Sequence, residues 1–126
     1  MGVLLVDDQK EIRYLLRLKL RAEPDLEVVG EAVNGEEAVR LAEELRPDVV
    51  VMDIMMPVMD GIEATRTIKQ RLPAVAVLGY SASDDPEKRS AMLAAGAYSC
   101  LVKTELEAIV PFIMKAAPRS EPCRAL

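Results

Sequence analysis

Histidine and tryptophan are absent from this 126-residue chain, and cysteine occurs only twice. Without histidine, the chain cannot build an imidazole metal site or use a histidine as a general base. Cys100 lies in an apolar run and Cys123 in a polar tail, a spacing that fits neither a disulfide framework nor a zinc site. We expect both to be free thiols in a reducing compartment. Any metal bound here must therefore be a hard cation held by oxygen atoms.

The chain also lacks a long apolar run and a basic cluster. No run approaches the roughly 20 residues of a membrane-spanning helix, and the N-terminus lacks the pattern of a signal peptide, so we expect a cytoplasmic protein without membrane contact. The 16 basic and 21 acidic residues give a net charge of −5, and no Lys/Arg cluster marks a face for nucleic acid. The length and the 51% of hydrophobic residues indicate a single globular domain.

Five short apolar runs recur along the chain, and segments with helical periodicity separate them. The runs are Val3–Val6, Leu26–Val29, Val49–Met52, Ala74–Leu78 and Cys100–Val102. Their brevity and their β-branched residues predict strands that are buried on both faces, as in a parallel sheet.

Apolar stripes and capping residues predict helices between these strands. The stripes are Ile12, Leu15, Leu16 and Leu20 in the first helix, and Ala38, Val39, Ala42 and Leu45 in the second. Helix starts are expected at Asn34, Asp60 and the pair Asp85–Pro86, and helix ends at Pro47 and Gly96. A fifth helix is expected over 104–117, opening with a capping box from Thr104 to Glu107. Because Pro111 lies inside it, we predict a kink or break near Val110.

This alternation predicts a doubly wound α/β domain with a five-stranded parallel sheet and five helices. The common flavodoxin-like strand order is 2-1-3-4-5, and ligands bind beyond the carboxyl ends of the strands where the order reverses. We expect the domain to span residues 1–117. Residues 118–126 are polar and contain two prolines, so we interpret them as a flexible tail or the start of a linker.

Polar side chains follow most of the expected strands. Asp7 and Asp8 follow the first, Asp53 ends the third, Ser81 follows the fourth, Lys103 ends the fifth, and the second contributes only Glu31. Clustered carboxylates repel one another unless a cation lies between them, and Mg²⁺ suits one or two carboxylates plus phosphate oxygens. A carboxylate can also attack a phosphoryl group, whose charge a metal and a lysine ammonium stabilise. The pattern therefore indicates a Mg²⁺-dependent aspartyl-phosphate site.

The motifs "LLVDDQ", "VVVMDIMMPVMDG", "LGYSAS" and "GAYSCLVK" occur in this order, each at a strand end. Together they resemble the receiver domain of two-component response regulators, over roughly residues 2–117. The stretch from Glu23 to Arg66 is similar to receivers that carry a LuxR-type helix-turn-helix output domain.

This resemblance implies a role for each motif residue. Asp53 would accept a phosphoryl group from a histidine kinase, in a signalling phosphoacceptor domain rather than an enzyme. The implied Mg²⁺ ligands are Asp7, Asp8, Asp53 and the backbone carbonyl of Met55. Ser81 would be the switch hydroxyl, Lys103 would pair with the phosphoryl group, and Ala82 would leave the approach to it open.

The family also implies how the domain meets its partners. A partner or homodimer surface would lie on the helices expected over 86–95 and 104–117 and on the strand Cys100–Val102, and DNA would be contacted only through a separate output domain. Receivers usually have Tyr or Phe three residues before the lysine, where this chain has Cys100. Tyr80, Tyr98 and Cys100 are therefore our candidates for the signalling surface. The chain is expected to be either a single-domain receiver or the receiver of a longer regulator.

Other interpretations stay open from the sequence. A pseudo-receiver would act as an interaction module without phosphorylation, and Cys100 favours it slightly. A phosphohydrolase of the haloacid dehalogenase type would need a second Asp two residues after the nucleophile, where this chain has Met55. Asp7 and Asp8 could instead cap the first helix, and Asp60 and Gly61 are expected to be helix-entry residues. Four methionines are expected to fill the core, namely Met52, Met55, Met56 and Met59.

Overall fold

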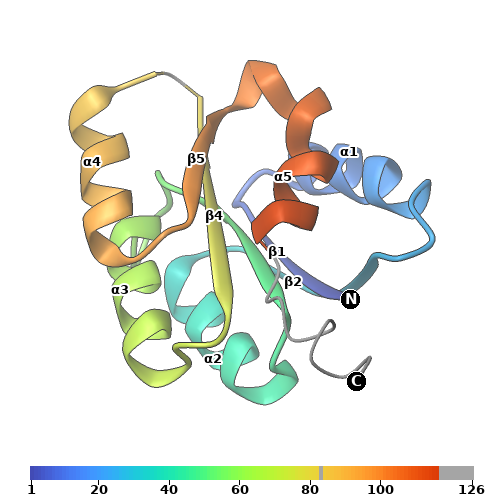
Figure 1. The fold of residues 1–126 in the computed structure, drawn as a ribbon. Helices are drawn as coiled ribbons and strands as arrows, with labels where there is room; N and C mark the ends of the chain where they lie inside the picture. The colour runs from blue at the N-terminus through green and yellow to red at the C-terminus, as the bar shows by residue number, and fades with distance from the viewer. Residues whose placement is uncertain (83, 117–126) are drawn as a thin grey trace.

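A computed structural model describes residues 1–82 and 84–116, in which five parallel strands alternate with five α-helices (Figure 1). The strands are β1 (Gly2–Val6), β2 (Glu27–Ala32), β3 (Val49–Asp53), β4 (Ala76–Ser81) and β5 (Ser99–Val102). The helices are α1 (Lys10–Arg21), α2 (Gly35–Leu45), α3 (Gly61–Arg71), α4 (Pro86–Ala95) and α5 (Ile109–Ala116), with a 3-10 helix, η1 (Lys103–Ala108), before α5. The strand order is β2-β1-β3-β4-β5, which confirms the predicted flavodoxin-like fold. The predicted tail, residues 118–126, lies outside the described residues.

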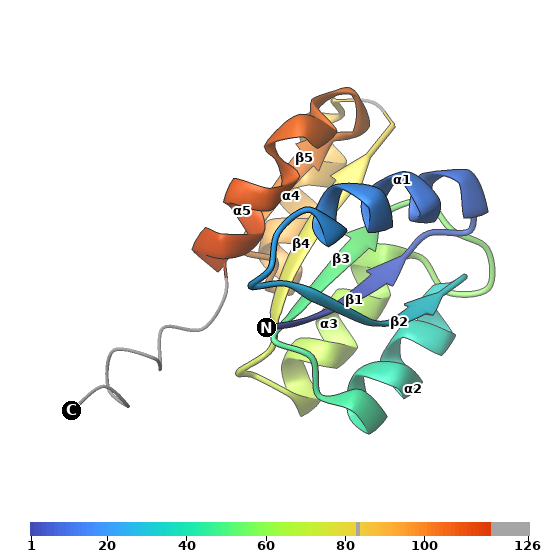
Figure 2. The ribbon, with the colours of Figure 1, turned by 90° about the vertical axis from the view of Figure 1, so that its right-hand side faces the viewer.

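The sheet separates two hydrophobic cores, because successive side chains of a strand point to opposite faces. Helices α2, α3 and α4 cover one face, and α1 and α5 cover the other (Figures 1 and 2). Buried strand residues on the α2–α4 face are Leu4, Val6, Ala32, Val50, Met52, Val77 and Cys100. Buried strand residues on the α1/α5 face are Val3, Leu5, Val49, Val51, Leu78, Tyr80 and Leu101. Burial on both faces explains why these strands read as continuous apolar runs.

β2 and β4 extend furthest beyond the apolar runs that predicted them, each by three residues at its end. We had expected Glu31 to follow the second strand. β2 instead continues to Ala32, so Glu31 lies inside it. β2 is at the edge of the sheet, where a side chain can reach solvent and a strand can tolerate charge. β4 continues through Gly79 and Tyr80 to Ser81, which is therefore its last residue.

The helix starts agree with the sequence. Side chains of Asn34, Asp60 and Asp85 accept hydrogen bonds from backbone N–H groups in the first turns of α2, α3 and α4. Gly96 ends α4 with φ at 114°, a conformation that suits glycine.

Two residues of the predicted apolar stripes are not buried. Leu15 and Leu45, expected in the buried stripes, are 45% and 41% exposed. Within the described residues, no helix is long and apolar enough to span a bilayer.

The last helix differs from its prediction at its start. The α-helix begins at Ile109, so the predicted start at Thr104 with a capping box is wrong. The kink or break predicted near Val110 is not found there, because α5 runs through Val110 and Pro111 to Ala116. The change from a 3-10 helix to an α-helix lies earlier, between Ala108 and Ile109. Pro111 is the third residue of α5, where the N–H that proline lacks would have no partner within the helix.

The segment between β3 and α3 folds back against the end of β3. The N–H of Gly61 donates to the carbonyl of Ile54 at 2.8 Å, and the N–H of Ile54 donates to the carbonyl of Tyr80 at 3.1 Å. A Cβ atom on Gly61 would collide with the backbone carbonyl of Asp53. The glycine therefore allows the close approach that fixes the end of β3.

Replacing Gly61 with alanine is expected to lower the free energy of unfolding by about 1–3 kcal/mol, because backbone atoms must shift to admit the methyl group. Gly30→Ala is the matched control, since its Cβ would lie 2.8 Å from Cδ1 of Leu45, the mobile end of an exposed side chain. Urea unfolding measures both variants. Equal losses of stability in the two variants would contradict the argument.

Candidate functional site

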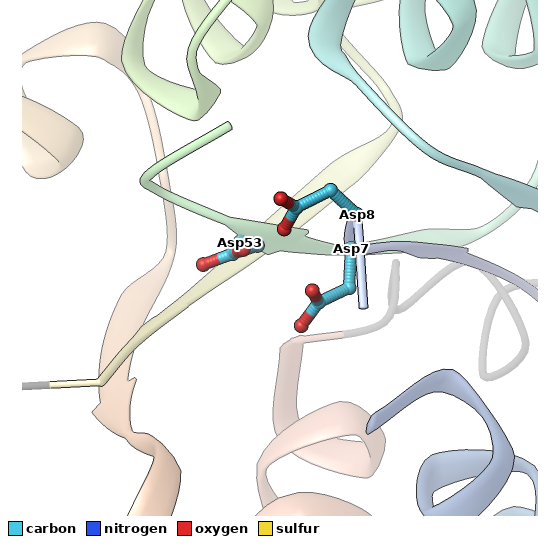
Figure 3. Close-up of side chains that lie close together, drawn as sticks. All are labelled: Asp7, Asp8 and Asp53. Atoms are coloured by element: carbon cyan, nitrogen blue, oxygen red, sulfur yellow. The ribbon is translucent and has the colours of Figure 1, made fainter. Parts of the chain in front are cut away.

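Three carboxylates meet at the carboxyl edge of the sheet. Asp7 and Asp8 follow β1 and Asp53 is the last residue of β3, as Figure 3 shows. One oxygen from each carboxylate lies within 4.8 Å of the others. Asp7 is fully buried and Asp53 is 3% exposed, whereas Asp8 is exposed. The cluster is therefore anchored in the fold on one side and open to solvent on the other.

Side-chain alternation decides which groups share a face of the sheet. Asp53 continues the series Val49, Val51 that faces α1 and α5, and Asp7 continues the series Val3, Leu5. Asp53 is paired in register with Tyr80, which faces the same side. The two buried acids and this tyrosine therefore lie on the α1/α5 side of the sheet.

Lys103 supplies the positive charge. It follows β5 directly, and its Nζ lies 3.1 Å from Oδ2 of Asp7 and 3.6 Å from Oδ2 of Asp53. The same ammonium lies 5.2 Å from the centroid of the Tyr80 ring, within cation–π range. The predicted meeting of Lys103 with the acids is thus present in the structure.

Asp7 is held on each of its oxygens. Its Oδ1 accepts from the backbone N–H of Gln9 at 2.8 Å, and its Oδ2 accepts from the hydroxyl of Tyr80 at 2.7 Å. Arg13 donates to the backbone carbonyl of Asp7 at 2.7 Å. The N-cap residue of α1 is Gln9, so the alternative that Asp7 or Asp8 caps this helix is wrong.

Ser81 and Cys100 lie on the other side of the sheet. Ser81 ends β4, is buried, and lines a small hollow with Ile54, Arg89 and Cys100. Ala82 follows it and is exposed. Cys100 is buried in the core beneath α4, as expected for a small hydrophobic side chain, and burial raises the pKa of its thiol.

The predicted signalling surface needs correction. Tyr80 and Cys100 are both buried, because their strand positions point into the two cores, and only Tyr98 is on the surface, with 53% exposed. Met55 was expected in the core but is 58% exposed, because it lies in the turn that leaves β3. Met52 is fully buried, and Met56 and Met59 pack against the core, as expected.

The electrostatic environment weakens Asp53 as an acid. Burial raises its pKa from 3.8 to about 7, and the negative charges of Asp7 and Asp8 act in the same direction. Lys103 and a hydrogen bond from the backbone N–H of Met55 lower the pKa but only in part. Burial and the charge of Asp7 also raise the pKa of Tyr80, so its hydroxyl keeps its proton and can donate it to Asp7. With every carboxylate ionised, the cluster would lack a full counter-charge.

The whole chain can be compared with known proteins. The family model described as "Response regulator receiver domain" matches residues 3–112. The chain belongs to this family. Receivers are signalling domains, and this one resembles receivers of the LuxR-type subgroup, as the following relatives show.

A curated relative and two solved structures illustrate the family. Transcriptional regulatory protein LiaR of Bacillus subtilis (strain 168) is 44% identical over 120 residues, which are 95% of this receiver and 57% of LiaR. The chain thus spans little more than half the length of this relative. A LuxR-family response regulator from Aurantimonas sp. matches with a TM-score of 0.82 and 32% identity, over 94% of this chain and 89% of that chain. The CheX–CheY–BeF3–Mg complex of Borrelia burgdorferi matches with a TM-score of 0.81 and 27% identity, over 90% and 89%.

Two contacts of Asp7 were missed by sequence reasoning, one with Tyr80 and one with Arg13. The contact of Tyr80 with Asp7 follows from alternation along β4 and from its register with β3, but the apolar run had placed the end of β4 at Leu78. Arg13 binds both the carbonyl of Asp7 and the carboxylate of Glu31, at 2.8 Å. Its spacing from Arg17, one helical turn away and also paired with Glu31, is the only sequence signal for this contact.

The raised pKa of Asp53 predicts how the metal-free receiver responds to pH. The folded state holds the Asp53 proton more tightly than the unfolded chain, so this residue's contribution to stability falls as pH rises from about 4 to 7 and is lost above 7. Asp53→Asn removes the charge and is expected to raise the free energy of unfolding at pH 7.5 by about 1–2 kcal/mol.

Urea unfolding between pH 5 and 8 in EDTA, at roughly constant ionic strength, measures this difference. Asp60→Asn is the control, because Asp60 lies at the start of α3 and asparagine is an equally good N-cap. A difference between Asp53→Asn and wild type that stays constant over this pH range would contradict the assignment.

Proposed function

We propose that this receiver accepts a phosphoryl group on Asp53 from a histidine kinase, in a Mg²⁺-dependent reaction that switches a partner-binding surface. The observation that carries the proposal is the meeting of Asp7, Asp8 and Asp53 with the ammonium of Lys103 at the edge of the sheet. When all three carboxylates and the ammonium of Lys103 are ionised, the cluster has a net charge of −2, which a divalent cation would neutralise.

The acid cluster has the chemistry of a Mg²⁺ site. Mg²⁺ prefers carboxylate, carbonyl and water oxygens, and keeps part of its coordination shell for phosphate oxygens. Asp7, Asp8, Asp53 and the backbone carbonyl of Met55 would hold it. The ion would supply positive charge next to the oxygens of the phosphoryl group. The similarity to the CheX–CheY–BeF3–Mg complex supports this assignment.

The protein's own groups would divide the remaining work. A carboxylate oxygen of Asp53 would attack phosphorus, and the leaving group would depart with the electron pair of the broken bond. Lys103, which already lies within 3.6 Å of Asp53, would balance the charge of the phosphoryl oxygens. The Ser81 hydroxyl would donate to a phosphoryl oxygen, and the methyl side chain of Ala82 would leave room for the incoming group.

The alternatives have less support. The pseudo-receiver is favoured only by Cys100, and the proximity of the acids to Lys103 argues against it. A phosphohydrolase of the haloacid dehalogenase type would need an acid two residues after Asp53, and this position is the thioether of Met55.

The family also suggests which partners this receiver contacts. As in LuxR-type regulators, DNA would be contacted through a separate output domain rather than by this domain, whose net charge is −5. A homodimer or partner surface would lie on α4, β5 and α5, where Leu93 on α4 and Tyr98, directly before β5, are exposed. A cytoplasmic location would give the domain access to the kinase.

Acetyl phosphate with Mg²⁺ tests the phosphoacceptor directly. We expect wild-type protein to gain one phosphoryl group, seen by intact-mass spectrometry, and to lose this reaction in EDTA. Asp53→Asn is expected to abolish the product, since an amide oxygen is a much weaker nucleophile than a carboxylate. Asp60→Asn, which alters an acid outside the cluster, should react as wild type does. Phosphorylation that persists in Asp53→Asn would disprove the assignment.

The phosphorylated form is expected to hydrolyse slowly. In receivers, the residues two positions after the phosphoacceptor and two after the switch hydroxyl tune water access, and here they are Met55 and Ser83. Ser83 lies outside the described residues. Exposed Met55 has no acid or amide to orient a water molecule. We predict a phosphoryl lifetime of minutes or longer, measured by mass after removal of acetyl phosphate, and a shorter one in Met55→Asn. A wild-type lifetime of seconds would contradict this.

A further inference from the structure

Tyr80 packs in the hydrophobic core on the α1/α5 side of the sheet and also contacts the acid cluster. Its side chain is fully buried on the α1/α5 side, yet its hydroxyl lies 2.7 Å from Oδ2 of Asp7 and 3.2 Å from the carbonyl of Val6. A hydroxyl has one proton to donate, and the shorter contact, to a carboxylate, is the stronger hydrogen bond.

The reach of tyrosine is what makes this contact possible. Tyr80 lies on β4 and Asp7 follows β1, and β3 lies between these strands. Two strand spacings amount to about 10 Å. The ring passes over the position of Asp53, its register partner, and places the hydroxyl next to Asp7. Neither a shorter polar side chain nor phenylalanine could make the same hydrogen bond.

Lys103 lies on the same ring. Its Nζ is 5.2 Å from the ring centroid and 3.1 Å from Oδ2 of Asp7, the oxygen that also accepts from Tyr80. When Lys103 turns to a phosphoryl group on Asp53, Asp7 loses this ammonium as a partner. The hydroxyl of Tyr80 would remain on Oδ2, so this buried oxygen would still accept a hydrogen bond after Lys103 has turned away.

We propose that Tyr80 is a positioning residue of the metal site, whose hydroxyl fixes the carboxylate of Asp7 for Mg²⁺ while its ring supports Lys103. This inference rests on the proposed function, because it assumes that the acid cluster binds Mg²⁺. Hydrogen-bond partners of metal ligands typically change metal affinity by about 10- to 100-fold when they are removed.

Tyr80→Phe isolates the hydroxyl, because the ring still fills the core and still faces Lys103. We expect its dissociation constant for Mg²⁺ to rise about tenfold, at the lower end of that range. A ¹⁵N-detected NMR titration of the metal-free protein with MgCl2 measures the affinity, and the same spectra report whether the variant is folded. Tyr98→Phe, which removes the hydroxyl of an exposed tyrosine, is the matched control and should bind Mg²⁺ as wild type does.

A double-mutant cycle separates positioning from a general effect on stability. If Tyr80 acts through Asp7, Tyr80→Phe should no longer weaken Mg²⁺ binding in an Asp7→Asn background. A further measurement uses the wild-type protein and so does not depend on the folding of a variant. The hydroxyl proton of Tyr80 is buried and donated to a carboxylate, so it should give a resolved NMR signal that shifts as Mg²⁺ binds.

The outcomes distinguish this inference from the proposal beneath it. Wild-type protein that binds no Mg²⁺ would overturn the proposed function and this inference together. Wild-type binding with an unchanged affinity in folded Tyr80→Phe would overturn the role of Tyr80 alone. The same conclusion would follow from a tenfold loss that persists in Asp7→Asn, or from a hydroxyl signal that does not respond to Mg²⁺.

Discussion

Repulsion among three carboxylates is the constraint around which this edge of the sheet is arranged. Asp7 and Asp53 are buried and Asp8 is exposed, with oxygens within 4.8 Å of one another. The fold offsets part of this repulsion with an ammonium, a phenolic hydroxyl and two backbone N–H groups. Burial, together with the repulsion that these groups do not offset, keeps the pKa of Asp53 near 7. The residual negative charge favours the binding of a divalent cation.

The two-residue alternation of the strands distributes the site over both faces of the sheet. Asp7, Asp53 and Tyr80 point to the side of α1 and α5, whereas Ser81, one residue further along β4, lines a hollow on the side of α4. In that hollow, Arg89 donates to the carbonyl of Cys100 at 3.2 Å and to Asp84 at 2.7 Å. β5 and α4 are therefore joined by a polar contact to the backbone of Cys100, while the Cys100 side chain, at the position where receivers usually have an aromatic ring, packs in the apolar core with Met92 of α4.

The sequence was sufficient for features that depend on neighbouring residues, and insufficient for those that depend on register. The helix caps followed from capping residues, and the convergence of the acids with Lys103 followed from the polar residues that end the apolar runs. The strand order was instead taken from the common flavodoxin-like arrangement. Burial of Tyr80 did not, because it depends on how far β4 extends past Gly79. The start of α5 was misplaced because a capping box does not distinguish an α-helix from the 3-10 helix found there. Val58, with φ at 71° on an exposed β-branched residue, is a strained position that no pattern indicated.

Two of these departures, the burial of Tyr80 and the strained Val58, lie close to Asp53 in register or in sequence, and there is a physical reason for this. Residues in the core contribute to stability, so their positions follow from the pattern of apolar side chains. At the end of β3 the chain instead buries a carboxylate next to two others and holds Val58 in a left-handed conformation a few residues later, and both features cost stability. The apolar strands β1 and β4 on either side of β3 are buried on both faces, and their burial offsets the loss of stability at this site. Under the proposed function, a cation that binds among the three carboxylates would remove the repulsion that the fold has left in place, and its binding would therefore stabilise the folded domain.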